Sequence, residues 1–143
     1  MEALAAASSV LAVVSLALQL ADNVQRLVDF WDSVKDAPAE VAEIRSHLRI
    51  LGEVLRSIES DSQHWLTDDG DSLGHDCLLI FKGSIAKLEK LSNGWSRELG
   101  RMGIRRKWSC LKKALREHEL ARYWSELERA KSTLMMCQCL RNG

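Results

Sequence analysis

The sequence has a single proline, Pro38, and only eight glycines among its 143 residues. Proline and glycine are the residues that most often interrupt regular secondary structure, so their scarcity favours long elements. No stretch alternates apolar and polar residues as a half-buried strand does. Hydrophobic residues make up 46% of the chain. Together these features predict an ordered, all-α domain that spans residues 1–143.

Disulfide and glycosylation signals are also absent. The four cysteines at positions 77, 110, 137 and 139 form no recognisable framework, and no Asn-x-Ser/Thr sequon occurs. Both absences favour a reducing, intracellular environment. Cys137 and Cys139 lie two positions apart, which is roughly 200° around a helix, so they are poorly placed to share one metal ion.

Enzyme and metal motifs fail on inspection. His118 and Glu119 begin like a zinc-protease helix, but Arg122 stands where the second histidine ligand belongs. A calcium loop with Gly70 as its turn glycine would put Trp65 at the first ligand position, which requires a carboxylate. We therefore expect no catalytic residue, no metal, no cofactor and no enzymatic activity.

Apolar residues recur at steps of three and four in four segments, which is the pattern of a helical bundle with about five helices. We expect helices from Val41 to Ser60, from Leu78 to Trp95 with a stop or kink at Asn93–Gly94, at 104–115, and from Leu120 to Cys137, with a loop at 61–74. The seams comprise Val10, Val13, Ala17, Leu20, Val24, Leu27 and Trp31; Val41, Ile44, Leu48, Leu51, Leu55 and Ile58; Leu78, Phe81, Ile85, Leu88, Leu91 and Trp95; and Leu120, Tyr123, Leu127, Ala130, Leu134 and Cys137.

Residues 3–21, ALAAASSVLAVVSLALQLA, contain no charged residue, although 28% of the chain is charged. A signal peptide is one interpretation, because SLA at 15–17 resembles a cleavage site. Glu2 and the absence of a leading Lys or Arg argue against it. The apolar seam also continues to Trp31 without slipping, and a removable leader has no reason to share a packing stripe with the residues that follow.

A permanent membrane span is the second interpretation, because 19 helical residues reach about 28 Å. Seven of them are alanine, however, so insertion should be close to balanced. A third interpretation is a bundle helix that keeps some apolar surface exposed. We expect a helix that packs in the bundle or moves into lipid, with a break near Asp22 if Asp22 and Gln25 form a capping box.

The neutral net charge conceals an asymmetry. Residues 1–71 carry 5 Lys or Arg against 13 Asp or Glu, whereas residues 72–143 carry 15 against 7. The basic run RRKWSCLKKALR at 105–116 is the strongest cluster. It is either a solvated face that pairs with the acidic first half or a surface for anionic lipid. Nucleic acid is disfavoured, because the chain is neutral and no base-reading module is visible.

The order and spacing of several motifs resemble a known family. The small apolar opening, FWDSVKDAPAEV at 30–41 and the leucine-rich segment that follows resemble the N-terminal HeLo and HeLo-like domains of fungal STAND (NOD-like) receptors. Near the other end, KWSCLKKALREHELARYWSELERAKSTLMMCQCL at 107–140 resembles the Trp, Lys-Lys and Leu-Glu-Arg-x-Lys-Ser-x-Leu pattern of this family.

This resemblance implies a helical bundle that executes regulated cell death, including heterokaryon incompatibility and innate immunity in fungi. Such a domain precedes a NACHT-type NTPase in the same or a partner chain, and this chain would be the N-terminal part of a longer receptor. It is cytoplasmic and self-associates on activation. The first helix is then released to permeabilise the plasma membrane.

Two functions follow as hypotheses. The first is a membrane-disrupting effector that binds anionic lipid, and the second is a soluble adaptor for homotypic assembly whose first helix stays packed. The candidate membrane-inserting residues are Leu4, Val10, Leu11, Val13, Val14, Leu16, Leu18 and Leu20, and the candidate anionic-lipid-binding residues are Arg105, Arg106, Lys107, Lys112, Lys113 and Arg116.

Overall fold

The structure is a computed structural model that describes residues 2–60, 70–101, 108–115 and 118–142. Side chains are described for 11–58, 74–100, 108–113, 115 and 118–139. The described residues form five helices and no strand, which confirms the prediction of an all-α bundle. The helices are α1 (Glu2–Asp32), α2 (Ala39–Ser60), α3 (Gly70–Arg101), α4 (Trp108–Ala114) and α5 (Glu119–Asn142).

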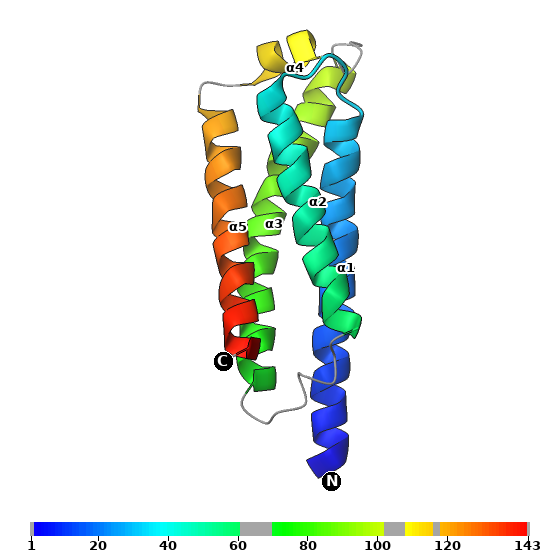
Figure 1. Cartoon of the computed structure of the whole chain (residues 1–143). Helices are drawn as coiled ribbons and strands as arrows, with labels where there is room; N and C mark the ends of the chain where they lie inside the picture. The colour runs from blue at the N-terminus through cyan, green and yellow to red at the C-terminus, as the bar shows by residue number, and fades with distance from the viewer. Residues whose placement is uncertain (1, 61–69, 102–107, 116–117, 143) are drawn as a thin grey trace.

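The four long helices form a bundle, and the short α4 lies across one end of it (Figure 1). α1 packs along α2, α3 packs along α5, and α1 also packs along α3, whereas α2 and α5 touch only lightly. The bundle therefore consists of two antiparallel pairs, α1/α2 and α3/α5, joined where α1 and α3 run in the same direction (Figure 1). We call the end that carries α4 the α4 end, and the opposite end, where both chain termini lie, the termini end.

The predicted seams form the core. In α1 every seam residue from Val13 to Trp31 is buried, and in α2 the whole seam is buried. In α3 and α5 only Leu91 and Leu120 are partly exposed. Burial of these stripes drives the association of helices that would be marginal alone. The largest fully buried side chains are Trp31, Tyr123, Phe81, Leu20, Leu27, Ile44, Leu48, Leu55, Ile58, Leu78, Ile85 and Leu88.

α1 is one continuous helix, so the expected break near Asp22 is wrong. The Gln25 side chain is engaged elsewhere: its Nε2 donates to Asp29 Oδ1 at 3.0 Å, and its Oε1 accepts from Arg56 of α2 at 3.3 Å. These bonds lie on the helix exterior, where a polar residue can follow the apolar run without interrupting the seam.

α3 is longer than its periodicity predicts. It begins at Gly70, within the expected loop at 61–74, whose residues 61–69 lie outside the described part of the chain. It also continues through Asn93–Gly94, so the predicted stop there is wrong. Ser92 and Trp95 are buried on either side of that pair. Their packing outweighs the cost of about 1 kcal/mol for a glycine inside a helix.

The connection between α1 and α2 is short and tied to α4. Asp36 adopts a positive φ of 60°, which turns the chain. The carbonyl of Pro38 then accepts from the backbone N–H of Val41 at 3.0 Å, so Pro38 stands at the start of α2 as expected. The carbonyl of Lys35 accepts from the N–H of Trp108 at 2.8 Å. This bond fixes the start of α4 over the end of the α1/α2 pair.

Candidate functional site: the uncharged first helix and its surroundings

The candidate membrane-inserting residues of α1 lie on different faces of the helix. Leu11 is 68% exposed to solvent. Val13 and Leu20 are buried in the core, so they become available to lipid only if α1 leaves the bundle. Leu4 and Val10 lie outside the described side chains. The remaining candidates, Val14, Leu16 and Leu18, are half-buried.

α1 lies close to α2 at Gly52. A Cβ atom built at Gly52 would stand 3.6 Å from Cγ1 of Val24, which is ordinary van der Waals contact. Small residues along α1, such as the buried Ala17 and Ala21, allow similarly close approach. The helix is therefore held mainly by apolar contacts that depend on shape rather than on directional bonds.

The stretch Leu11–Asp32 is long and apolar enough to cross a membrane, judged by length and composition alone. A core helix of a soluble bundle meets the same criterion, and 39% of this stretch is buried inside the protein. The first turns of α1 extend past the end of α2 at the termini end (Figure 1). α1 thus combines a packed inner face with an apolar outer face.

The candidate lipid-binding cations do not lie beside this segment. Lys112 and Lys113 are exposed on α4, at the opposite end of the bundle from the start of α1 (Figure 1). The other candidates, Arg105, Arg106, Lys107 and Arg116, lie outside the described residues. For the two described lysines, the structure separates the basic and the apolar candidate residues.

The charge asymmetry of the sequence divides the bundle into its two helix pairs. α1 and α2 come from the acidic half, and α3, α4 and most of α5 come from the basic half. Asp32 of α1 is 3.2 Å from Arg45 and 3.5 Å from Arg49, both on α2. Lys87 of α3 is 3.7 Å from Glu126 of α5. These ion pairs each join helices of the same half, and not the two halves to each other.

Aromatic side chains form a buried cluster near the α4 end. Trp31 lies edge-on to Tyr123 and to Trp95, with ring centroids 5.3 Å and 5.9 Å away. The indole N–H of Trp31 donates to the Tyr123 hydroxyl at 2.9 Å. Burial raises the pKa of Tyr123 to about 12, and hydrogen bonds with Trp31 and Ser92 oppose this shift. The phenol is a neutral structural group at physiological pH.

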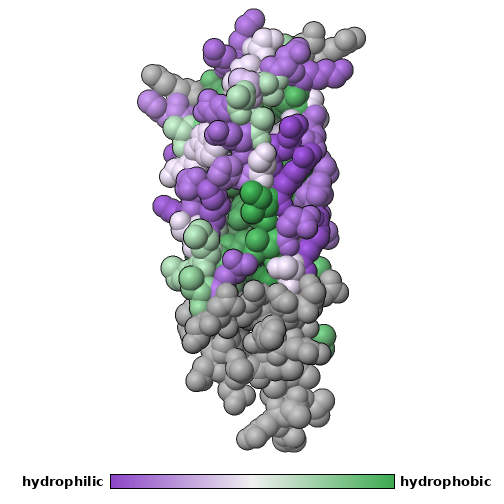
Figure 2. Space-filling model, viewed as in Figure 1, coloured by the Kyte–Doolittle hydropathy of each residue, from purple (hydrophilic) through white to green (hydrophobic). Residues whose placement is uncertain are grey.

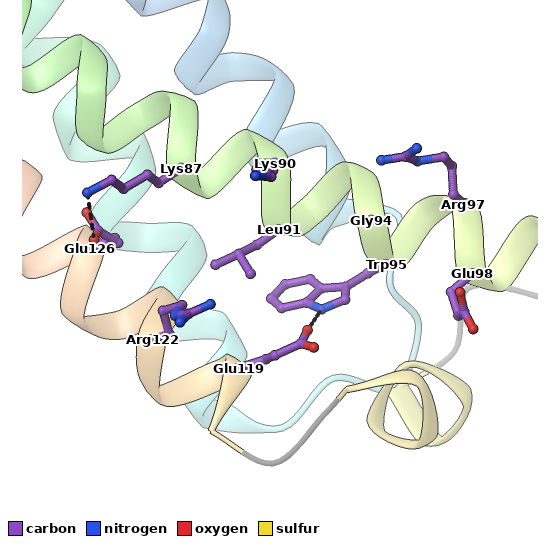
Figure 3. A pocket seen from close by; sticks show the side chains of 10 residues that line it. All are labelled: Lys87, Lys90, Leu91, Gly94, Trp95, Arg97, Glu98, Glu119, Arg122 and Glu126. Atoms are coloured by element: carbon purple, nitrogen blue, oxygen red, sulfur yellow. Dashed lines mark hydrogen bonds and ion pairs between the residues drawn. The ribbon is translucent and has the colours of Figure 1, made fainter.

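A groove of about 860 Å³ opens between α3 and α5 below α4 (Figure 3). Trp95 forms part of its floor, and its indole N–H donates to Glu119. Glu126 is paired with Lys87, while the Arg122 side chain reaches across toward Leu91 (Figure 3). The carboxylates of Glu119 and Glu126 are thus already engaged by groups of the protein. Mixed charges line the groove, so it has no strong preference for an anion or a cation.

Exposed hydrophobic residues outside α1 were missed by the sequence analysis. They are Ile50 of α2, Leu79 and Ile80 of α3, and Met135 and Met136 of α5. The available signal was the two runs LLIF at 78–81 and LMMC at 134–137. A helical stripe needs only the outer members of such a run, so the inner pair must face outward.

Among the described residues, no group of three or more His, Cys, Asp or Glu side chains is placed to hold a metal ion. Comparison of the chain with protein-family models, with curated proteins and with solved structures gave no match.

Proposed function

We propose that this chain is a membrane-disrupting effector of regulated cell death. In this proposal the protein is cytoplasmic, self-associates on activation and moves to the plasma membrane, where α1 leaves the bundle and enters anionic lipid. The observation that carries the proposal is the character of α1. It is uncharged from residue 3 to residue 21, it exposes Leu11, and its first turns extend past α2 (Figure 1).

The energetics of α1 favour such an exchange. The contacts that hold Val13, Ala17 and Leu20 in the core are apolar, and lipid tails can replace apolar contacts at little cost. No charge of residues 3–21 would have to be buried in the bilayer. A switch requires two states that differ by only a few kcal/mol, and a helix with this composition meets that condition.

Many copies side by side would increase membrane attraction without any new contact, because each bound subunit raises the effective concentration of the next. This is the role we propose for self-association. In the resembling family a NACHT-type NTPase drives that assembly, and we propose the same partner for this chain.

The competing function is a soluble adaptor whose first helix stays in place. The burial of every seam residue from Val13 to Trp31 favours it, because these side chains make α1 an integral part of the core. Both functions agree with a folded monomer, so a membrane experiment must separate them.

Leakage of a trapped dye from phosphatidylserine-containing vesicles separates the two functions. We expect leakage with the unmodified chain and at least a tenfold loss with Leu11→Glu. Leu11 is 68% exposed, so the added charge leaves the fold intact. Ile50→Glu is the matched control, since Ile50 is 62% exposed on α2, and this variant should leak like the unmodified chain. Absence of leakage by the folded, unmodified chain at any concentration would favour the adaptor.

A further inference from the structure

Exposed large hydrophobic side chains gather at one end of the bundle. Of the six that the described residues contain, Leu11, Leu79, Ile80, Met135 and Met136 lie near the termini end, and only Ile50 lies elsewhere. We call these five residues the apolar ring. Figure 2 shows part of this distribution: hydrophilic residues cover most of the upper surface, and hydrophobic residues reach the surface lower down, next to the atoms drawn in grey.

Contacts between the helices place the ring residues at one level. Lys87 meets Glu126, and Cys137 Sγ lies 4.0 Å from the carbonyl oxygen of Gly74, which sets the register of α3 against α5. This register puts Met135 and Met136 beside residues 76–78 of α3. The contact of Trp31 with Trp95 likewise sets α1 against α3 and puts Leu11 beside residue 75. At 1.5 Å per residue, the five side chains fall within about 8 Å along the bundle axis.

The ring faces several directions. α1 packs on α2 and α3, whereas α5 packs on α3, so α1 and α5 stand at diagonal corners of the bundle. Leu11 and the two methionines are exposed and hence point outward from these corners. A single flat protein surface cannot cover residues that point away from one another. A bilayer can, because lipid surrounds whatever enters it.

Charge is scarce at the same level. Residues 3–21 of α1, 77–81 of α3 and 132–140 of α5 carry none. The α4 end differs: Lys35, Asp36, Glu40, Lys112 and Lys113 are all exposed there. Entry of the termini end into the apolar part of a bilayer therefore requires little desolvation of charge, whereas entry of the α4 end would require much.

We infer that the termini end of the folded bundle is the surface that first binds the membrane, through the apolar ring and with α1 still packed. This inference rests on the proposed function and divides it into two steps. Docking uses side chains of α1, α3 and α5, and release of α1 follows. The partner is a lipid surface, into whose interfacial region the ring inserts.

The test is co-sedimentation with vesicles of phosphatidylcholine and phosphatidylserine, using a variant that keeps α1 unchanged. Leu79→Gln, Ile80→Gln, Met135→Gln and Met136→Gln are combined, because glutamine preserves helix propensity while removing apolar surface. We expect at least a tenfold fall in the ratio of bound to free protein. Ile50→Gln, which alters an equally exposed side chain outside the ring, should bind within twofold of the unmodified chain. Circular dichroism verifies the folding of each variant.

Each outcome decides the inference. Equal binding by the folded ring variant and the unmodified chain overturns it; the proposed function survives that result if Leu11→Glu still abolishes leakage. An unmodified chain that does not bind vesicles overturns both. A chain that dimerises without lipid through the ring, and becomes monomeric in the ring variant, assigns the ring to a second copy and also overturns the inference.

A covalent lock tests whether packed α1 suffices for docking. Val24→Cys and Gly52→Cys place two thiols within reach across the α1/α2 contact. With the bond formed, and identified by mass spectrometry of the linked peptides, we expect vesicle binding to persist within twofold while leakage stops until a reductant is added. Loss of binding in the locked protein would contradict docking by the folded bundle.

Discussion

The two ends of the bundle are held together by different forces. At the α4 end the indole N–H of Trp31 donates to Tyr123 at 2.9 Å, that of Trp124 donates to Glu40 at 3.2 Å, and the N–H of Trp108 donates to Lys35 at 2.8 Å. Such bonds are directional and specify one arrangement of the helices.

At the termini end the described contacts are almost wholly apolar. Val13, Ala17 and Leu134 are buried there, and the polar contact of Cys137 with Gly74 is long, at 4.0 Å. Apolar contacts have no preferred direction, and lipid can supply them as well as protein can. The comparison teaches that one end is built to stay assembled and the other can exchange its partners.

Truncation of Trp31 should have the largest effect on this comparison. We expect Trp31→Ala to lower the free energy of unfolding by about 3–5 kcal/mol, because it leaves a cavity in the aromatic cluster and removes the donor to Tyr123. Val13→Ala at the termini end should cost only about 1–2 kcal/mol. Chemical denaturation followed by circular dichroism measures both values. Equal losses would mean that the two ends are equally well specified.

Titration of Tyr123 should have an intermediate effect. Its pKa in the folded state is about 12, above the ordinary value of 10.0, so folding favours the neutral phenol. This contribution is complete below about pH 10 and is lost as the pH rises toward 12. The loss should be on the order of 2 kcal/mol.

Denaturation of the unmodified chain and of Tyr123→Phe between pH 8 and 12 isolates this contribution. The variant should be less stable at pH 8, because the Trp31 indole loses its acceptor. It should also show the shallower decline above pH 10. Parallel declines in the two proteins would contradict the neutral, buried phenol.

The smallest expected effect is a gain in stability on α3. Gly83 is exposed, and an added Cβ there would meet no atom within 4 Å. Gly83→Ala should therefore raise the free energy of unfolding by about 0.5–1 kcal/mol, by removing backbone freedom from the unfolded chain. Thermal denaturation measures the gain. Since Gly83 lies toward the termini end, the pH dependence assigned to Tyr123 should be unchanged, and a change would mean that the two ends are coupled.

Much of the fold was predictable because its signal is local. A period of 3.6 residues can be read from the sequence, and the four seams it defined became the core. The predicted stop at Asn93–Gly94 failed because Trp95, which follows it, packs against Trp31 and Tyr123 from distant parts of the chain. Propensity at a glycine does not include such contacts.

The candidate site was predictable only in part. Composition identified the uncharged segment at 3–21, but not that Leu11 faces solvent while Val13, two residues later, is buried in the core. Nor did it indicate that Lys112 and Lys113 lie at the opposite end of the bundle. These properties depend on which helices are neighbours and on their register.

The sequence by itself therefore determined the helices and their buried faces, because each follows from residues within a few turns of one another. The tertiary structure decided which apolar side chains remain exposed, how they assemble into the apolar ring, and how far the basic α4 lies from it. Those features arise where helices distant in sequence pack side by side, and only packing of the whole chain sets the register between them.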